Sequence, residues 1–394
     1  MKYLIIGGGI AGTSCAEELR KLDPDAEITT IEQEYHRLYS RVLLPHYAMG
    51  KVEREKCFLK TEEWYQENKI ELLLGQSVVK LDSKNKFVEL DDARELPYDK
   101  LLISTGSEPR VIGGEPRGVV YFWTLDDVDQ ILKITQENKK IKKEKNKAIV
   151  YGGGFIACEF INTFQHFGID TTVAHRGKHF WNSILNDQAG EFVRAHLEKS
   201  GVKVVSEIDN VEIVGDKEIE TIQINNDQTP CSLLAVAVGS NRDLSFVQEA
   251  GIEVDQAIKT NEFLETNVAD IYAAGDVAES YDPVACRQYA AGNWFRAMVQ
   301  GKTVAKTMFG DRTEYKQVSS YAMNLLGLDI SFIGDTNKNM ADQVKLWGQA
   351  DEKGMCLIYL RLNKIVGAVI LGKNQFRPSL TKAIKSGLTE SELK

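Results

Sequence analysis

The stretch that decides the fold is Leu4-Ile5-Ile6-Gly7-Gly8-Gly9-Ile10-Ala11-Gly12, close to the start of the chain. Its apolar residues predict a buried parallel strand, its glycines a tight turn, and the residues from Thr13 to Leu22 a helix. Such a turn aims helix N–H groups and the helix dipole at a pyrophosphate. A second copy is Ile149-Val150-Tyr151-Gly152-Gly153-Gly154-Phe155-Ile156-Ala157. One copy alone could be an ordinary glycine-rich turn, but a matched pair predicts two dinucleotide sites.

An acid completes the first copy. The segment Ile28-Thr29-Thr30-Ile31 predicts a second strand that ends at Glu32. This is the usual distance past the glycines for a carboxylate that accepts hydrogen bonds from ribose hydroxyls. A surface carboxylate at a strand end is the alternative interpretation of Glu32. We expect the first dinucleotide to contact Gly7, Gly9, Ala11, Gly12, Glu32 and Gln33.

Two later segments give the chain a specific resemblance. One is Thr266-Asn267-Val268-Ala269-Asp270-Ile271-Tyr272-Ala273-Ala274-Gly275-Asp276, and the other is Leu101-Leu102-Ile103-Ser104-Thr105-Gly106-Ser107-Glu108-Pro109. Taken singly, each contains an ordinary turn. With the glycine copies, and in this order, they resemble the FAD-dependent pyridine nucleotide-disulfide oxidoreductases. The resemblance implies that Asp276 hydrogen-bonds the ribityl and pyrophosphate region of FAD. It adds to the FAD site Val78, Thr105, Gly106, Gly275 and Asp276.

Length and composition are ordinary for a soluble globular protein. The chain has 394 residues, enough for two or three domains, and is 43% hydrophobic and 27% charged. No apolar stretch is long enough to span a bilayer, and the N-terminal run predicts a strand instead of a signal peptide. We expect a cytoplasmic protein. The basic run from Asn138 to Lys147 predicts a solvated helix end, because the net charge is −9 and no aromatics interleave it. A nucleic-acid or acidic-partner contact is the alternative.

The cysteines argue against disulfide chemistry. They are scattered without Cys-x-x-Cys spacing, which predicts buried free thiols and no metal site. The disulfide reductases of the superfamily carry a dithiol or a reactive cysteine near the segment Tyr39-Ser40-Arg41-Val42-Leu43-Leu44-Pro45, which here has none. Disulfide reduction and cysteine peroxidase chemistry are therefore disfavoured. The cysteines are Cys15, Cys57, Cys158, Cys231, Cys286 and Cys356.

The same segment points to another branch of the superfamily. It resembles the flavin-side loop of NADH:rubredoxin reductases and of the FAD module of assimilatory nitrite reductases. The resemblance implies that Arg41 binds the FAD pyrophosphate or lies near the isoalloxazine, where a guanidinium stabilises negative charge on reduced flavin. A solvated loop arginine is the alternative.

The second glycine copy departs from the fingerprint in two places. Its third glycine is replaced by Ala157, which the general pattern allows at some cost in helix-to-strand packing. The strand Thr171-Thr172-Val173-Ala174 is followed by His175 where an NAD enzyme usually places an acid. His175, Arg176 and Lys178 could instead pair with the 2′-phosphate of NADP. A basic turn without preference, and a site that binds nicotinamide nucleotide poorly, both stay open.

The family resemblance implies that the second copy binds NAD(P). It places Glu159 near the nicotinamide and flavin N5, and Trp294 as a wall of the active site. The alternatives are a helix-surface carboxylate and a core aromatic. We expect Arg41, Glu159 and Trp294 to shape catalysis. The expected NAD(P) contacts are Gly152, Gly154, Phe155, Ile156, Glu159, His175, Arg176 and Gly239.

The order of the motifs predicts an α/β fold of two nested Rossmann-like, three-layer dinucleotide-binding domains and a small α/β C-terminal domain. The FAD-binding domain would comprise residues 1–113 and 245–315, the NAD(P)-binding domain residues 114–244, and the C-terminal interface domain residues 316–394. The resemblance implies that the last domain covers the flavin and in many members forms a dimer interface. Monomer and homodimer both stay open.

The predicted reaction is hydride transfer from NADPH or NADH to FAD, followed by electron transfer to an external acceptor. Candidate acceptors are a rubredoxin- or ferredoxin-type protein and a nitrite-reductase partner. Two alternatives stay open: a flavin electron-transfer subunit or redox sensor that does not turn over NAD(P)H, and an NAD(P)H oxidase that uses dioxygen. The sequence does not name the acceptor.

Overall fold

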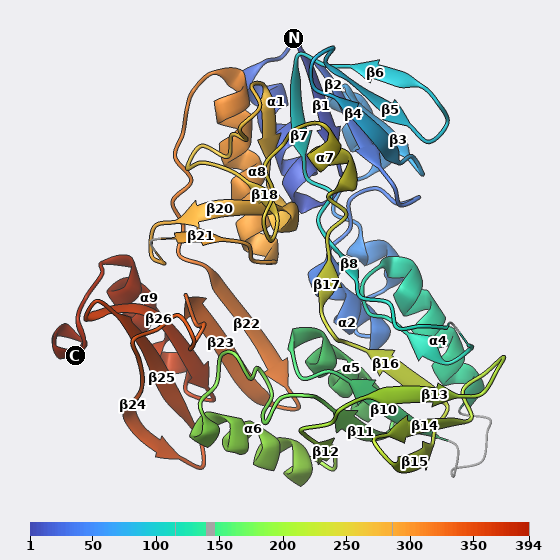
Figure 1. The fold of residues 1–394 in the computed structure, drawn as a ribbon, viewed down its shortest axis with the longest axis vertical. Helices are drawn as coiled ribbons and strands as arrows, with labels where there is room; N and C mark the ends of the chain where they lie inside the picture. Colours follow the sequence, from blue (N-terminus) through green and yellow to red (C-terminus); the bar gives the residue numbers. More distant parts are fainter. Residues whose placement is uncertain (115, 139–145, 286, 394) are drawn as a thin grey trace. The chain divides into compact units, whose positions relative to one another are not determined.

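The computed structural model describes residues 1–114, 116–138, 146–285 and 287–393 (Figure 1). The chain forms two compact units. Unit 1 comprises Met1–Val42, Arg54–Glu108 and Arg242–Ser319. Unit 2 comprises Leu43–Glu53, Pro109–Asn241 and Ser320–Lys394. The short strands β8 (Glu108–Pro109) and β17 (Ser240–Asn241) fall where the chain passes from one unit to the other.

Unit 1 is built on a parallel five-stranded sheet with the order β19-β7-β1-β2-β3. Along β1, Tyr3 and Ile5 face one hydrophobic cluster while Leu4 and Ile6 face another. Because both faces are buried, residues 3–6 of the strand are all apolar instead of alternating with polar residues. The strands are β1 (Lys2–Ile6), β2 (Glu27–Glu32), β3 (Ile70–Leu74), β7 (Lys100–Ile103) and β19 (Ile271–Ala273).

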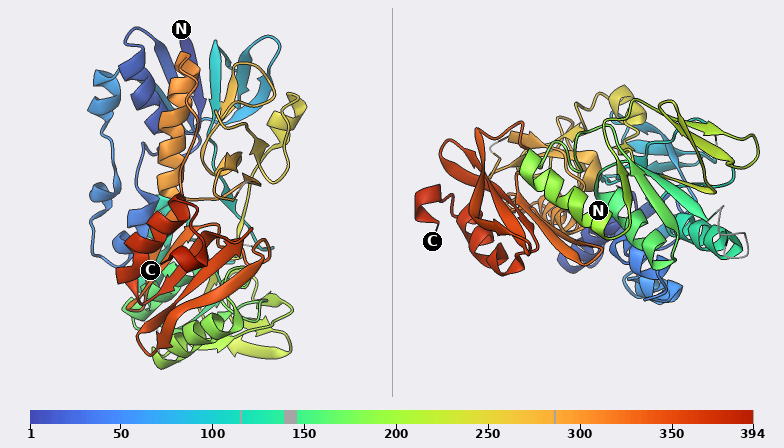
Figure 2. Two further views of the ribbon diagram at one scale, coloured as in Figure 1. Left: turned by 90° about the vertical axis from the view of Figure 1, so that its left-hand side faces the viewer. Right: turned by 90° about the horizontal axis from the view of Figure 1, so that it is seen from below.

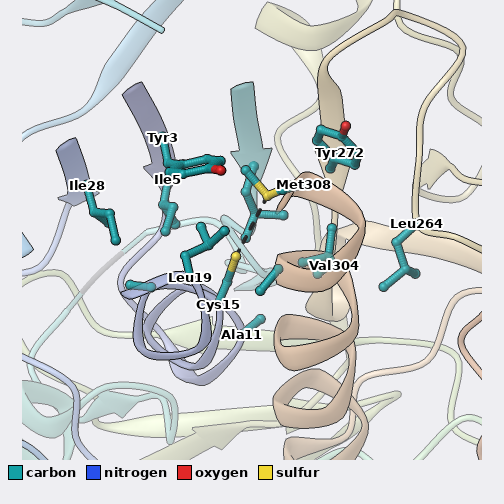
Figure 3. Packing of buried hydrophobic residues seen from close by; sticks show 14 of the residues in the cluster. Tyr3, Ile5, Ala11, Cys15, Leu19, Ile28, Leu264, Tyr272, Val304 and Met308 are labelled. Carbon is teal, nitrogen blue, oxygen red and sulfur yellow. Dashed lines mark hydrogen bonds between the residues drawn. The ribbon is translucent and has the colours of Figure 1, made fainter. Parts of the chain in front are cut away.

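Two helices cover one face of this sheet. Helices α1 (Ile10–Leu22) and α8 (Trp294–Phe309) pack against each other. Figure 3 shows Leu19 and Cys15 of α1 between the strands and Met308 of α8, with the Cys15 and Met308 sulfurs 3.8 Å apart. The smaller elements of unit 1 are α3 (Glu62–Glu67), β4 (Val78–Asp82), β5 (Phe87–Leu90), β6 (Glu95–Pro97), α7 (Ser245–Glu249), β18 (Ile258–Lys259), β20 (Ala278–Asp282) and β21 (Arg287–Tyr289).

The opposite face of the sheet is covered by the antiparallel strands β4, β5 and β6 and by α7, whose apolar side chains share a cluster with Leu4 and Ile6. The sheet is therefore the middle of three layers.

Unit 2 repeats the plan with a parallel sheet of order β12-β11-β10-β16-β9. Strands β13 and β14, which form an antiparallel sheet with β15, share a hydrophobic cluster with Ile149 and Tyr151 of β10. The elements are α2 (Leu44–Ala48), β9 (Val119–Val120), α4 (Leu125–Asn138), β10 (Lys147–Tyr151), α5 (Phe155–His166), β11 (Asp170–Ala174), α6 (Asp187–Lys199), β12 (Lys203–Val205), β13 (Val211–Val214), β14 (Thr221–Ile224), β15 (Asp227–Pro230) and β16 (Leu233–Val236).

An antiparallel sheet completes unit 2, in the order β22-β23-β26-β25-β24. Helix α9 (Arg377–Lys385) packs against β23 and β26 (Figure 2). The sheet is tied to the second glycine turn's domain by Tyr359, whose hydroxyl donates to the Ile184 carbonyl at 2.8 Å. The strands are β22 (Ser320–Leu325), β23 (Leu328–Gly334), β24 (Gln343–Asp351), β25 (Gly354–Arg361) and β26 (Lys364–Leu371).

The predicted fold class is confirmed. The helices and strands expected around both glycine turns are present, and the first helix begins at Ile10, three residues earlier than predicted. Five cysteines are free and buried, as predicted: Cys15, Cys57, Cys158, Cys231 and Cys356. Cys286 and residues 139–145 of the basic run lie outside the described residues.

Gly301 marks the closest approach of α8 to α1, and we predict that Gly301→Ala destabilises the protein. An added Cβ would lie 2.2 Å from the Ala11 carbonyl oxygen. Alanine stabilises a helix by up to about 1 kcal/mol relative to glycine. Overpacking costs about 1–3 kcal/mol, so the net free energy of unfolding should fall. The midpoint of guanidinium chloride unfolding measures the change. Lys302→Ala, on the exposed side of α8, is the control. A midpoint for Gly301→Ala at or above the wild-type value would contradict the packing.

Candidate functional site

The first glycine turn joins β1 to α1 within unit 1. Gly7 has a φ of +100°, and a Cβ there would lie 2.3 Å from the Ser104 carbonyl oxygen. A Cβ on Gly12 would lie 2.0 Å from the Gly7 carbonyl oxygen. Gly9, by contrast, has nothing within 4 Å of its Cβ position, and as the N-cap of α1 it supplies no side-chain acceptor. The helix therefore begins with unsatisfied N–H donors beside an open space, which suits a phosphate.

Glu32 lies against this turn, as predicted from its spacing. Its carboxylate accepts from the Gly8 N–H at 2.7 Å and from the Glu34 N–H at 3.1 Å. Burial raises the pKa of Glu32, while these N–H donors and the charge of Arg41 lower it. Gln33, the next residue, is exposed.

Arg41 is held by a carboxylate that sequence reasoning missed. Its Nη2 lies 2.6 Å from one oxygen of Glu34, and the hydroxyl of Tyr39 donates to the other oxygen at 2.7 Å. The Arg41 side chain is 41% exposed. Burial alone would lower its pKa, but Tyr39, Glu34, Glu32 and Asp276 outweigh that effect and raise it. The guanidinium is thus a fixed cation that faces the acids of the first site.

Gly275 and Asp276 follow β19, as the motif predicts. The Gly275 N–H donates to the Gln300 side chain of α8 at 2.8 Å. Burial raises the pKa of Asp276, and Arg242, Arg41 and Arg296 lower it. Arg242 donates to the backbone carbonyl of Asp276. The charges of three arginines therefore act on the aspartate expected to bind the cofactor.

Arg296 is the most buried of these arginines, at 2% exposure. It donates to the Ser280 hydroxyl at 2.7 Å and to the Tyr289 carbonyl at 2.9 Å. Its position in the first turn of α8 gave no sequence signal, because a charge there usually faces solvent. Arg242 likewise lies in no recognisable motif.

The remaining residues expected at the first site lie in unit 1. Trp294 is the first residue of α8 and is partly buried, and Asn293 caps the helix by accepting from the Arg296 N–H at 2.9 Å. Thr105 is exposed, and Gly106 has a left-handed φ of +74° with open space at its Cβ position. Val78 begins β4 and packs on the core below the sheet.

The second glycine turn repeats this geometry within unit 2. Gly152 has a φ of +140°, and a Cβ there would lie 2.1 Å from the Ala237 carbonyl oxygen. Gly154 has nothing within 4 Å of its Cβ position and is the N-cap of α5 without a side-chain acceptor. Ala157 is fully buried inside the helix. The substituted third glycine thus leaves the turn intact.

A cavity of about 390 Å³ opens at this turn. Arg176 reaches it from the end of β11 and donates from Nε to the Tyr151 hydroxyl at 3.1 Å. His175 is buried, its Nδ1 lies 2.7 Å from the Gly177 carbonyl, and burial lowers its pKa. Lys178 pairs with Asp187 at 2.6 Å and does not line the cavity. Of the predicted basic group, Arg176 is the residue placed to carry charge into the cavity.

Glu159 and Phe155 lie on the same helix, α5. Burial raises the pKa of the Glu159 carboxyl to about 7. The Phe155 ring packs edge-on against the rings of Tyr321 and Phe332, both from the C-terminal sheet. The distances between ring centroids are 4.9 Å and 5.0 Å. Ile156 follows at the helix start and is partly buried. Gly239, past β16, has a φ of +100° and accepts a backbone hydrogen bond from Arg110 at 3.0 Å.

Two negative findings concern the described residues alone. Residues 1–114, 116–138, 146–285 and 287–393 contain no cluster of histidine, cysteine or acidic side chains suited to a metal ion. Among the helices formed by those residues, none has both the length and the apolar character needed to cross a membrane.

Two Rossmann-like sheets, each ending in a glycine turn whose helix has no side-chain cap, are the architecture of a protein with two dinucleotide-binding sites. Residues 1–301 match the family model described as pyridine nucleotide-disulphide oxidoreductase, and the chain belongs to this family. The cofactors used in the family are FAD and NAD(P)H.

Individual relatives agree with the family. The chain is 31% identical over 379 residues to nitrite reductase (NAD(P)H) of Bacillus subtilis (strain 168), covering 94% of this chain and 45% of that protein. It is 28% identical to NADH-rubredoxin oxidoreductase of Clostridium acetobutylicum, covering 98% and 94%. The crystal structure of NADH:rubredoxin oxidoreductase from that organism matches with a TM-score of 0.80 at 27% identity, covering 98% of this chain and 96% of that chain.

The length of the match differs among the curated relatives. The chain spans about half the length of the B. subtilis nitrite reductase, 45%, and of the assimilatory nitrate reductase electron transfer subunit of the same organism, 49%.

The partly buried carboxyl of Glu159 predicts a pH-dependent stability. Its pKa rises from an ordinary 4.5 to about 7, so between these values the folded chain binds more protons than the unfolded chain. The contribution of Glu159 to stability therefore falls as pH rises through this window. Glu159→Gln has no group that titrates at this position, so it does not lose this stability. The melting temperature of the variant minus that of wild type should therefore increase from about pH 5 to about pH 8. A difference that is constant or shrinks over this range, measured without nicotinamide nucleotide, would contradict the burial.

Proposed function

We propose that the protein is an FAD-dependent oxidoreductase that oxidises NADPH or NADH and passes the electrons to an external acceptor. One observation carries the proposal: two parallel sheets each end in a glycine turn whose helix has no side-chain cap. An unfilled helix N-terminus with an open glycine beside it is a site for a phosphate-bearing ligand. Two such sites in one chain fit a reaction between two dinucleotides.

The residues of unit 1 fit FAD. When bound, FAD accepts two electrons as a hydride and can release them one or two at a time. In our proposal the uncapped α1 donors bind the pyrophosphate, and the acids near the turn bind hydroxyls. The proposed FAD contacts are Gly7, Gly9, Ala11, Gly12, Glu32, Gln33, Arg41, Val78, Thr105, Gly106, Gly275 and Asp276.

Arg41 is the proposed tuning cation. A guanidinium near the flavin stabilises negative charge in the reduced state, and an arginine keeps its proton at every physiological pH. The hydrogen bonds from Tyr39 and Arg41 to the two oxygens of Glu34 fix the orientation of the guanidinium. A charge held in place before reduction does not have to reorganise during it.

The residues of unit 2 fit a nicotinamide nucleotide. We propose that the α5 N-terminus binds its pyrophosphate and that Gly152, Gly154, Phe155, Ile156 and Gly239 line its path. Arg176 and His175 lie at the adenosine end. Glu159 and Trp294 are proposed to shape the nicotinamide side, where the task of the protein is to orient the ring and exclude water. The three-domain division, residues 1–113 with 245–315, 114–244 and 316–394, belongs to the same proposal.

The proposed acceptor is a small redox protein. The names of relatives support this: NADH-rubredoxin oxidoreductase of C. acetobutylicum, and the ferredoxin–NAD(+) reductase subunit of the benzene 1,2-dioxygenase system of Pseudomonas putida, 26% identical over 335 residues. Five buried free thiols support a reducing compartment, and we propose a cytoplasmic location. A homodimer formed through the C-terminal segment is part of the proposal.

Anaerobic stopped-flow spectroscopy tests the reaction. Mixing the FAD-loaded protein with NADPH or NADH should bleach the oxidised flavin band in a rapid phase, because hydride transfer between stacked rings is intrinsically fast once they are oriented.

A flavin that stays oxidised with both nucleotides, yet is reduced by dithionite, would contradict the proposal and favour an electron-transfer subunit or sensor. Hydrogen peroxide released in air at the full turnover rate would make dioxygen the acceptor instead of a redox protein.

A further inference from the structure

The nucleotide cavity of unit 2 contains an arginine that the glycine motifs do not include. Arg110 and Arg176 both line the cavity of about 390 Å³. They reach it from different segments: Arg110 follows β8 in the chain, whereas Arg176 lies two residues past β11. The sequence alone does not indicate that these two arginines lie at one cavity, because 65 residues separate them. Arg110 lies in the segment where the chain passes from unit 1 into unit 2.

Each guanidinium is anchored through its Nε atom. Arg110 donates from Nε to the Asn241 side chain at 2.9 Å, and Arg176 donates from Nε to the Tyr151 hydroxyl at 3.1 Å. The backbone of Arg110 is also fixed, by its N–H bond to the Gly239 carbonyl at 3.0 Å. Within the described part of the chain, neither guanidinium has a hydrogen-bond partner at its Nη atoms. Two oriented sets of charged donors are therefore available to a ligand.

The lining of the cavity is suited to an anion. No carboxylate is among the described residues that line it. His179 also lines it and is 8% exposed. Asp187 lies 3.3 Å from the Nε2 of His179, but it pairs with Lys178 and is not a lining residue. Among the described residues that line the cavity, the permanently charged ones are therefore Arg110 and Arg176.

We propose that Arg110 and Arg176 together bind the 2′-phosphate of NADP, and that Arg110 is a specificity-determining residue. The inference rests on the proposed function, in which this cavity takes the adenosine half of a nicotinamide nucleotide. The uncapped N–H groups of α5 already provide for the pyrophosphate. A second, arginine-rich set of donors then needs another phosphate, and guanidinium groups match a phosphate dianion with paired, charge-assisted hydrogen bonds.

Two adenosine fragments test the assignment without turnover. The full-length, FAD-loaded protein is titrated calorimetrically with 2′,5′-ADP and with 5′-AMP, which differ by the 2′-phosphate. Wild type should bind 2′,5′-ADP at least about tenfold more tightly. Arg110→Ala and Arg176→Ala should each lower the affinity for 2′,5′-ADP about tenfold or more. Each should change the affinity for 5′-AMP by less than about twofold. The double variant should lose less binding free energy for 2′,5′-ADP than the two single variants together, because both side chains bind the same phosphate.

Controls separate local binding from general charge. Arg117→Ala removes an arginine of unit 2 that pairs with Glu137 and does not line the cavity, so both fragments should bind as in wild type. Arg110→Lys keeps the positive charge but lacks the paired N–H donors of a guanidinium. This variant should therefore recover part of the preference for 2′,5′-ADP over 5′-AMP.

The outcomes are distinguishable. If Arg110→Ala weakens both fragments equally, Arg110 serves the 5′ side and the inference fails. If wild type binds both fragments equally and its flavin is reduced by NADH, the inference fails while the proposed function stands. If neither fragment binds and neither nucleotide reduces the flavin, both fail.

Discussion

The structure depends on one local constraint, the uncapped start of a helix at the carboxyl end of a buried parallel strand. Helices α3, α6 and α8 begin with a side-chain cap from Thr61, Asn186 or Asn293, whereas α1 and α5 begin with glycine and no side-chain acceptor. Gly12 against Gly7, and Gly152 against Ala237, leave no room for a Cβ. Close packing thus holds each turn in a shape that presents N–H donors to a phosphate.

The two sites differ in how they arrange charge around that shared turn. In unit 1, carboxylates and arginines act on one another: Glu34 binds Arg41, and the charges of Arg242, Arg41 and Arg296 lower the pKa of Asp276. In our proposal this arrangement binds hydroxyls of FAD and places a cation near the flavin ring. In unit 2, two arginines line the cavity, and no carboxylate does so among the residues that the structure describes. One fold therefore supports two kinds of recognition through the residues at the ends of its strands.

The sequence predicted what is local. The glycine turns, Glu32 at the end of β2 and Gly275-Asp276 after β19 follow from short spacings, and each lies where the pattern places it. Contacts between distant segments had no such signal. Gln300 bonded to Gly275, Arg242 bonded to Asp276 and Arg110 beside the second turn become visible only when the strands are assembled. The placement of residues 43–53 in unit 2 is of the same kind, since it depends on the packing of α2 against α4 and α5.

The most direct test of the central claim pairs Gly9→Val with Gly154→Val. Each glycine has open space at its Cβ position, so both variants should fold while filling a phosphate site. Flavin content, released and counted per chain, and flavin reduction by NADPH and NADH are then measured. The account predicts that Gly9→Val lacks FAD, and that Gly154→Val keeps about one FAD per chain that dithionite reduces but nicotinamide nucleotides do not. Full FAD retention in Gly9→Val, or normal reduction by NADPH and NADH in Gly154→Val, would contradict it.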